Sequence, residues 1–87
     1  MTDNNFDRET LRALADEGNE LALDRLADLA DAEDDLPTLS ELLDEGSAHA
    51  GALLTRRAVA RRDLLELQRL ADAGSPDAEV ALTRLLM

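Results

Sequence analysis

The chain carries a glycine that recurs every 28 residues, at Gly18, Gly46 and Gly74. Each of these glycines follows a leucine-rich segment with the same spacing of apolar residues. Self-similarity at a fixed period is typical of repeat proteins, in which one small structural unit is stacked on copies of itself. The period divides the sequence into three units, at residues 7–34, 35–62 and 63–87. It therefore predicts one helical-repeat domain.

The composition favours α-helix throughout the chain. Hydrophobic residues make up 45% of it, most of them leucine and alanine, and Phe6 is the single aromatic residue. Leucine and alanine are strong helix formers, whereas strands draw on β-branched and aromatic residues. We therefore expect an all-α fold.

Each unit predicts two helices separated by its glycine. Apolar residues at i, i+3 and i+4 before the glycine give one buried stripe. These stripes are Leu11, Leu14 and Ala15, then Leu39, Leu42 and Leu43, then Leu67, Leu70 and Ala71. The glycine suits the position just beyond a helix end, where a left-handed backbone conformation is required. The residues that follow, Asn19, Ser47 and Ser75, are good N-caps, so each unit is expected to form an αα-hairpin with a two-residue turn.

The starts of the first helices also carry capping signals. Asp7, Asp35 and Asp63 are candidate N-caps, and Phe6 is positioned to pack on Leu11 as a hydrophobic staple. The expected architecture is therefore six helices in three stacked αα-hairpins, which together form a short right-handed α-solenoid.

The three units share the spacing Ala-x-x-Gly-x-x-x-Ala-x-x-x-Leu, with leucine replacing the first alanine in the second unit. The matching residues are Ala15, Gly18, Ala22 and Leu26, then Leu43, Gly46, Ala50 and Leu54, then Ala71, Gly74, Ala78 and Leu82. This spacing resembles the core of Sel1-like repeats, a branch of the tetratricopeptide-like α-solenoids. The units of those families are longer, at about 34 residues, and their later glycine and aromatic positions are missing here. The resemblance implies a protein-binding scaffold without cofactors or catalytic residues.

The formal net charge of −11 limits the choice of partners. It disfavours direct binding to nucleic acid or to an anionic membrane, because both need a positive surface. Two interpretations remain: a charge that keeps the chain soluble, and an acidic decoy that mimics DNA and occupies a basic site on a nucleic-acid-binding protein. No apolar run approaches the ~20 residues of a membrane span, and the first residues do not resemble a secretory signal. We expect a cytoplasmic protein without membrane association.

The residue types that support catalysis are scarce. The chain has no cysteine and no tyrosine, its nine basic residues are all arginine, and His49 is the single histidine. A lone histidine without cysteines or a second histidine at i+3 or i+4 makes a poor metal site. We therefore expect no enzymatic activity, no metal and no cofactor, and we expect His49 to be a surface residue.

An acidic run in the first unit corresponds to arginines in the second. Alignment by 28 residues predicts three ion pairs: Asp28 with Arg56, Glu33 with Arg61, and Asp34 with Arg62. More broadly, the arginines either pair with the acidic run or form a docking patch for an acidic partner. The arginines are Arg56, Arg57, Arg61 and Arg62, and the acidic run is Asp28, Asp31, Glu33, Asp34 and Asp35.

Arg57 breaks an apolar pattern, because its counterparts are Leu29 and Leu85. Its stem could lie over Leu53 and Leu54 with the charged end in water, or Arg57 could be a recognition residue in the middle of the array.

Two further sets of residues are candidates for protein interaction. Asp16, Asp44 and Asp72 each lie two residues before a glycine, where a carboxylate opposes the helix dipole. They either bind the N–H groups that open the next helix or form an acidic stripe for a basic partner. The last helix ends in the apolar residues Leu82, Leu85 and Leu86 without a polar cap. We expect this end to mediate self-association, for example a homodimer, or to bind another protein.

Overall fold

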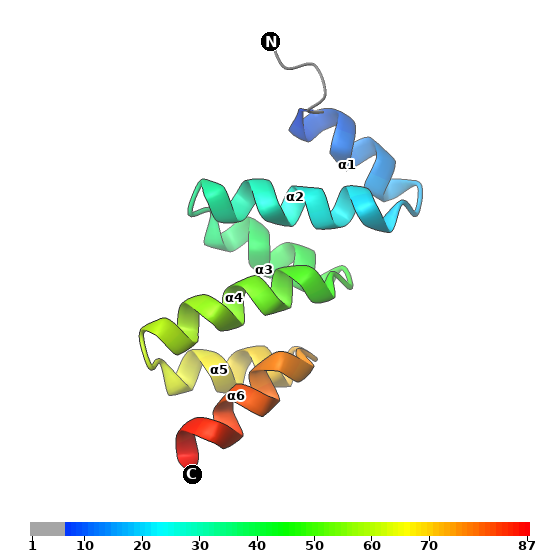
Figure 1. Ribbon diagram of the computed structural model, residues 1–87. Coiled ribbons are helices and arrows are strands. Elements are labelled where there is room, and N and C mark those ends of the chain that lie inside the picture. The colour runs from blue at the N-terminus through cyan, green and yellow to red at the C-terminus, as the bar shows by residue number, and fades with distance from the viewer. Residues whose placement is uncertain (1–6) are drawn as a thin grey trace.

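The computed structural model describes residues 7–87, and every regular element in this range is an α-helix (Figure 1). The six helices are α1 (Arg8–Asp16), α2 (Glu20–Ala32), α3 (Leu36–Asp44), α4 (Ala48–Ala60), α5 (Leu64–Asp72) and α6 (Pro76–Leu86). The predicted all-α class is confirmed. The predicted contact between Phe6 and Leu11 lies outside the described residues.

The five connections between these helices share one three-residue design. At the connection between α3 and α4, the N–H groups of Gly46 and Ser47 donate to the carbonyls of Leu43 and Leu42, each at 2.9 Å. This pair of bonds is a Schellman motif, which closes a helix. The Ser47 hydroxyl then accepts a hydrogen bond from the Ala50 N–H at 3.0 Å, which opens α4. One residue therefore ends one helix and begins the next.

Two details of these connections differ from the sequence-based expectation. The turns after α1, α3 and α5 have three residues rather than two, because a C-cap residue such as Glu45 precedes the glycine. The three periodic glycines do adopt positive φ angles, as predicted, with Gly46 at 103°. However, the other two connections place Asp34 (φ 56°) and Arg62 (φ 53°) in the same left-handed position.

The N-caps are formed as predicted. Each cap side chain accepts a hydrogen bond from the backbone N–H three residues later, which satisfies one of the free donors of a helix start. The capping residues are Asp7, Asn19, Asp35, Ser47, Asp63 and Ser75.

The helices pack mainly on their neighbours in the chain, so the molecule is elongated, at 46 × 25 × 17 Å. Helix α2 contacts α1, α3 and α4, and helix α4 contacts α2, α3, α5 and α6. The largest fully buried side chains are Leu39, Leu42, Leu67 and Leu70, on α3 and α5. Ala22, Ala50 and Ala78 are buried near the starts of α2, α4 and α6. This places the leucine stripes against small residues of the neighbouring helices.

The left-handed positions predict two stability effects of opposite sign. In Gly46→Ala the added Cβ meets no atom within 4 Å, so the cost is backbone strain alone, about 1–2 kcal/mol. In Arg62→Gly the same strain is relieved, and we expect unchanged or higher stability. Urea denaturation of both variants measures these effects. Equal destabilisation by the two substitutions would contradict this account of the connections.

The cap at the connection between α2 and α3 predicts a dependence on pH. Thr38 donates to the Asp35 carboxylate from its hydroxyl at 2.7 Å and from its N–H at 3.2 Å, and Arg8 donates at 3.2 Å. The hydroxyl bond is the main cause that lowers the pKa of Asp35 from its ordinary value of 3.8. A carboxylate with a lowered pKa in the folded state stabilises the protein above its ordinary pKa, and this contribution is lost as pH falls through the folded value.

We therefore expect wild-type stability to begin falling near pH 3.8 and to continue falling below it. Asp35→Asn keeps an oxygen acceptor for the cap but removes the titration. This variant should be less stable at neutral pH and should lose less stability on acidification. Urea denaturation across this pH range checks the difference, and identical pH profiles would show that Asp35 contributes nothing to acid sensitivity.

Candidate functional site

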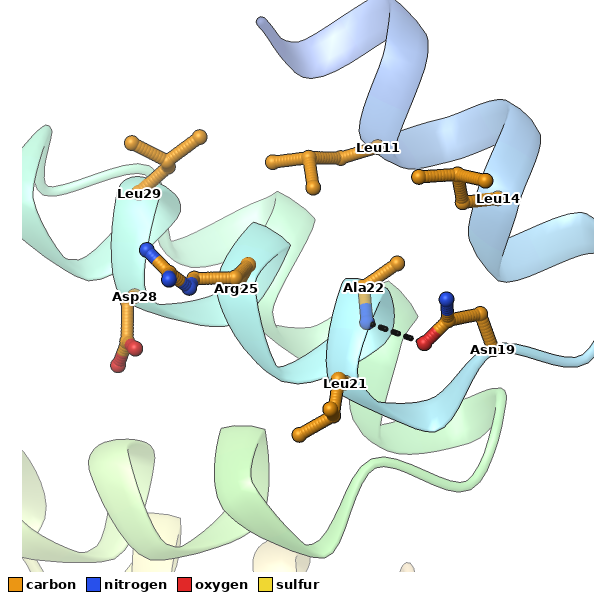
Figure 2. A pocket seen from close by; sticks show the side chains of 8 residues that line it. All are labelled: Leu11, Leu14, Asn19, Leu21, Ala22, Arg25, Asp28 and Leu29. Carbon is orange, nitrogen blue, oxygen red and sulfur yellow. Dashed lines mark hydrogen bonds between the residues drawn. The ribbon is translucent and has the colours of Figure 1, made fainter. Parts of the chain in front are cut away.

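An open apolar groove of about 430 Å³ lies along α1 and α2 (Figure 2). Helix α1 contributes Leu11 and Leu14, and α2 contributes Ala22 and Leu29. The remaining lining residues are Asn19, Leu21, Arg25 and Asp28. The Asn19 side chain is held by its own capping bond, in which it accepts from the Ala22 N–H at 3.1 Å. The groove therefore has an apolar floor, a few polar groups at its edge, and walls set by helix packing.

The corresponding residues of the second unit lie in the core. Leu39 and Leu42, the counterparts of Leu11 and Leu14, are 0% and 1% exposed. In the first unit Leu11 is also buried, at 4% exposed, whereas Leu14 is only half-buried. The difference arises because α2 packs on α3 and α4, whereas no described helix precedes α1. The sequence analysis did not identify this groove. It could have been predicted from the position of Leu11 and Leu14, because they lie in the first unit, which has no preceding unit among residues 7–87 to cover them.

At the opposite end of the chain, α6 leaves much of its apolar surface uncovered. Val80 is 54% exposed, Leu86 68% and Met87 94%. Leu82 and Leu85 are half-buried and pack against the core. Of the three predicted leucines at this end, Leu86 is therefore the exposed one, and the sequence analysis missed Val80 and Met87 beside it.

Arg57 is held in place by residues of α2 and of the connection that follows it. Its Nε donates to the Asp31 carboxylate at 2.7 Å, and its Nη2 donates to the Asp31 carbonyl at 2.7 Å and to the Asp34 carboxylate at 2.8 Å. The bond to Asp31, followed by the bond to Asp34, raises the pKa of Arg57. These bonds occupy the guanidinium within the molecule, which argues against a role for Arg57 as a free recognition residue.

The three ion pairs predicted from the 28-residue alignment are wrong. Within residues 7–87, none of the salt bridges joins Asp28 to Arg56, Glu33 to Arg61, or Asp34 to Arg62. Residues at equivalent positions of similarly oriented helices point the same way, so they do not face each other. Cross-unit bonds instead join one face of α2 to a different face of α4, as in Asp31 with Arg57.

His49 belongs to this contact between α2 and α4. Its Nε2 lies 2.6 Å from the Asp28 carboxylate, and 37% of its side chain is exposed. His49 is thus at the surface, as predicted, but it is paired. Among residues 7–87, no cluster of His, Cys, Asp and Glu is suited to hold a metal ion.

The three aspartates before the glycines are exposed, but the predicted bonds to the next helix do not form. Asp16 accepts from Arg12 at 3.2 Å and Asp72 accepts from Gln68 at 3.1 Å, both within their own helices. The pKa of Arg69 is raised, mainly by its hydrogen bond to Glu66, and the charge of Asp44 contributes least to this shift. The N–H groups that open α2, α4 and α6 bind the cap residues instead. The structure does not bring the three carboxylates together in one pocket.

No helix in the described part of the chain combines the length and the apolarity that a membrane span requires. The chain matches no protein-family model, no curated protein and no solved structure.

The bonds of Arg57 predict a salt-dependent effect on stability. Arg57→Met keeps much of the apolar stem but leaves Asp31 and Asp34 as unpaired like charges, so the melting temperature should fall. Arg57→Lys keeps the charge but loses the planar, bidentate geometry of guanidinium, and should lie between wild type and Arg57→Met. Thermal melts at about 0.1 M and about 1 M NaCl test this, because salt screens exposed charges. A Met variant as stable as wild type at low salt would show that the bridge adds nothing.

Proposed function

We propose that the chain is a helical-repeat module that binds another protein, or itself, through the faces of its helices. The proposed arrangement is three αα-hairpins stacked as a short right-handed α-solenoid, of the Sel1-like or tetratricopeptide-like kind. The regular helix lengths support it, because each unit pairs a helix of nine residues with one of 11 or 13 residues. Packing between neighbours in an elongated molecule is also what a solenoid requires.

The observation that carries this proposal is the exposed apolar surface at both ends of the molecule. Leu21 on α2 is 77% exposed and Leu86 on α6 is 68% exposed, each beside further apolar residues. Contiguous apolar surface of this kind marks interaction sites in folded proteins. The proposal assigns the chain no catalytic activity, because cysteine, lysine and tyrosine are missing from the sequence and it holds a single histidine.

A second candidate function rests on the charge of −11. Exposed aspartates and glutamates along the helices would suit an acidic decoy that occupies a basic site on a nucleic-acid-binding protein. The two functions differ in the physical force that holds the partner. A decoy binds through charge and weakens steeply as salt rises, whereas packing on leucine faces does not.

Affinity capture at two salt concentrations tests the proposal. The immobilised chain is incubated with lysate of the source organism at about 0.1 M and about 1 M NaCl, and the bound proteins are identified by mass spectrometry. We expect a specific protein to remain at both concentrations and to be lost from Leu86→Glu. Leu65→Glu is the matched control, because Leu65 is 84% exposed on α5 and its counterpart in the first unit is Glu9.

Two results would overturn the leading proposal. Loss of every bound protein at high salt would favour the acidic decoy. Recovery of the same proteins by wild type and Leu86→Glu would show that the α6 surface is not the binding face.

A further inference from the structure

The exposed surface of α6 corresponds to surfaces of α2 and α4 that are buried inside the molecule. Ala27 and Ala30 of α2 are fully buried, and so is Ala58 of α4. The residues at the same positions of the period in α6 are Thr83 and Leu86, and both are exposed. Helices follow α2 and α4 and cover these surfaces, whereas no described helix follows α6. The α6 surface is therefore exposed, although the surfaces at the same positions of α2 and α4 are buried in an internal contact.

The groove on α1 and α2 is the other half of the same contact. Its residues correspond to the part of α3 and α4 that packs against α2. Leu42 at this position is 1% exposed, while its counterpart Leu14 borders the open groove. The two ends of the molecule thus present the two complementary sides of an interface that the chain already builds internally.

One pair of residues at the edge of this interface changes in a matched way. Between the first and second units, Asp31 faces Arg57 in a salt bridge at 2.7 Å. Between the second and third units, the same two positions hold Val59 and Leu85. At the free ends they hold Met87 on α6 and Leu29 in the groove. At these two positions a polar pair is replaced by an apolar pair, so Met87 and Leu29 match each other in character.

From these observations we propose that the chain associates head to tail with a second copy of itself. The surface of α6 formed by Val80, Thr83, Leu86 and Met87 enters the groove on α1 and α2 of the next copy, with Met87 against Leu29. The proposal rests on the proposed protein-binding function and names its partner. Leu86 is larger than the alanines at its internal counterparts, and the groove of about 430 Å³ provides space for it.

This contact is heterologous, since two different surfaces meet. Such a contact builds an open chain of copies, or a ring if the rotation closes. Each copy carries a net charge of −11, so repulsion between copies opposes association. Added salt screens that repulsion, and self-association should therefore strengthen as salt rises.

Single-face variants provide the test. Leu29→Glu blocks the groove, and the fold tolerates a charged residue at this position of the period because Arg57 occupies it in the second unit. Leu86→Glu blocks the α6 surface, and Leu65→Glu is the control. The three variants add the same charge, so general repulsion is matched. Leu21→Glu, at a position that is 77% exposed, is a second groove variant if melting curves show that Leu29→Glu is poorly folded.

Sedimentation equilibrium at up to about 100 μM protein measures the mass of each variant. We expect the wild type and Leu65→Glu to exceed the monomer mass, and to increase in mass with concentration. Each blocked variant should bind itself at least about tenfold more weakly, because a buried leucine is lost from the contact. An equimolar mixture of Leu29→Glu and Leu86→Glu should form a 1:1 dimer and stop there, because one intact groove and one intact α6 surface remain.

Three results would overturn the inference: a monomeric wild type at this concentration, a mixture of blocked variants that does not dimerise, or a Leu29→Glu chain that dimerises as well as wild type. The last result would indicate a symmetric contact between two α6 surfaces. A monomeric chain that still captures a different protein at high salt would overturn the self-association alone and leave the proposed function in place. A chain that neither self-associates nor captures a protein would overturn both.

Discussion

The structure depends on five residues, one at each helix connection, that each end one helix and cap the start of the next. Ser47 donates its N–H to the carbonyl of Leu42 and accepts the Ala50 N–H on its hydroxyl. The first bond ends α3 and the second begins α4, so the chain changes direction within three residues and pairs part of the free groups at both helix ends. Asn19, Asp35, Asp63 and Ser75 perform the same two functions at the other connections. Because every connection has the same length and the same bonds, each helix is placed against the previous one in a fixed way.

This regularity accounts for the elongated shape and for the ends of the molecule. Helix α4, for example, has one surface toward α2 and α3 and another toward α5 and α6. Inside the chain these surfaces cover each other, and bonds such as those from Arg57 to Asp31 and Asp34 join their edges. At the ends each surface lies open. The groove by Leu29 and the exposed Leu86 therefore follow from the same packing that buries Leu42 and Ala58.

Local chemistry was predictable from the sequence, and contacts between units were not. Glycines at positive φ and short polar caps leave a signature in neighbouring residues, so Gly18, Gly46, Gly74 and their caps were identified correctly. The positive φ angles of Asp34 and Arg62 were not predicted, because neither residue type indicates a left-handed backbone. The pairing of Arg57 with the acidic run of the first unit was predicted and is confirmed by its bonds to Asp31 and Asp34. The individual residue pairs and the partner of His49 were not predicted, since alignment by a period shows which residues are equivalent but not which ones face each other. Gly51 is another example: a Cβ there would lie 3.0 Å from Leu43 and 3.1 Å from the Ser75 hydroxyl, a close approach that only packing reveals.

The proposed self-association joins the two ends of the molecule as complementary halves of one interface. A concentration series of two-dimensional ¹H–¹⁵N NMR spectra tests it most directly, because each amide reports separately on its own surroundings. As concentration rises, we expect signals to shift in two separate groups, one around Leu14, Leu21 and Leu29 and the other around Val80 and Leu86. Shifts limited to one of these groups, or spectra that do not change with concentration, would contradict it.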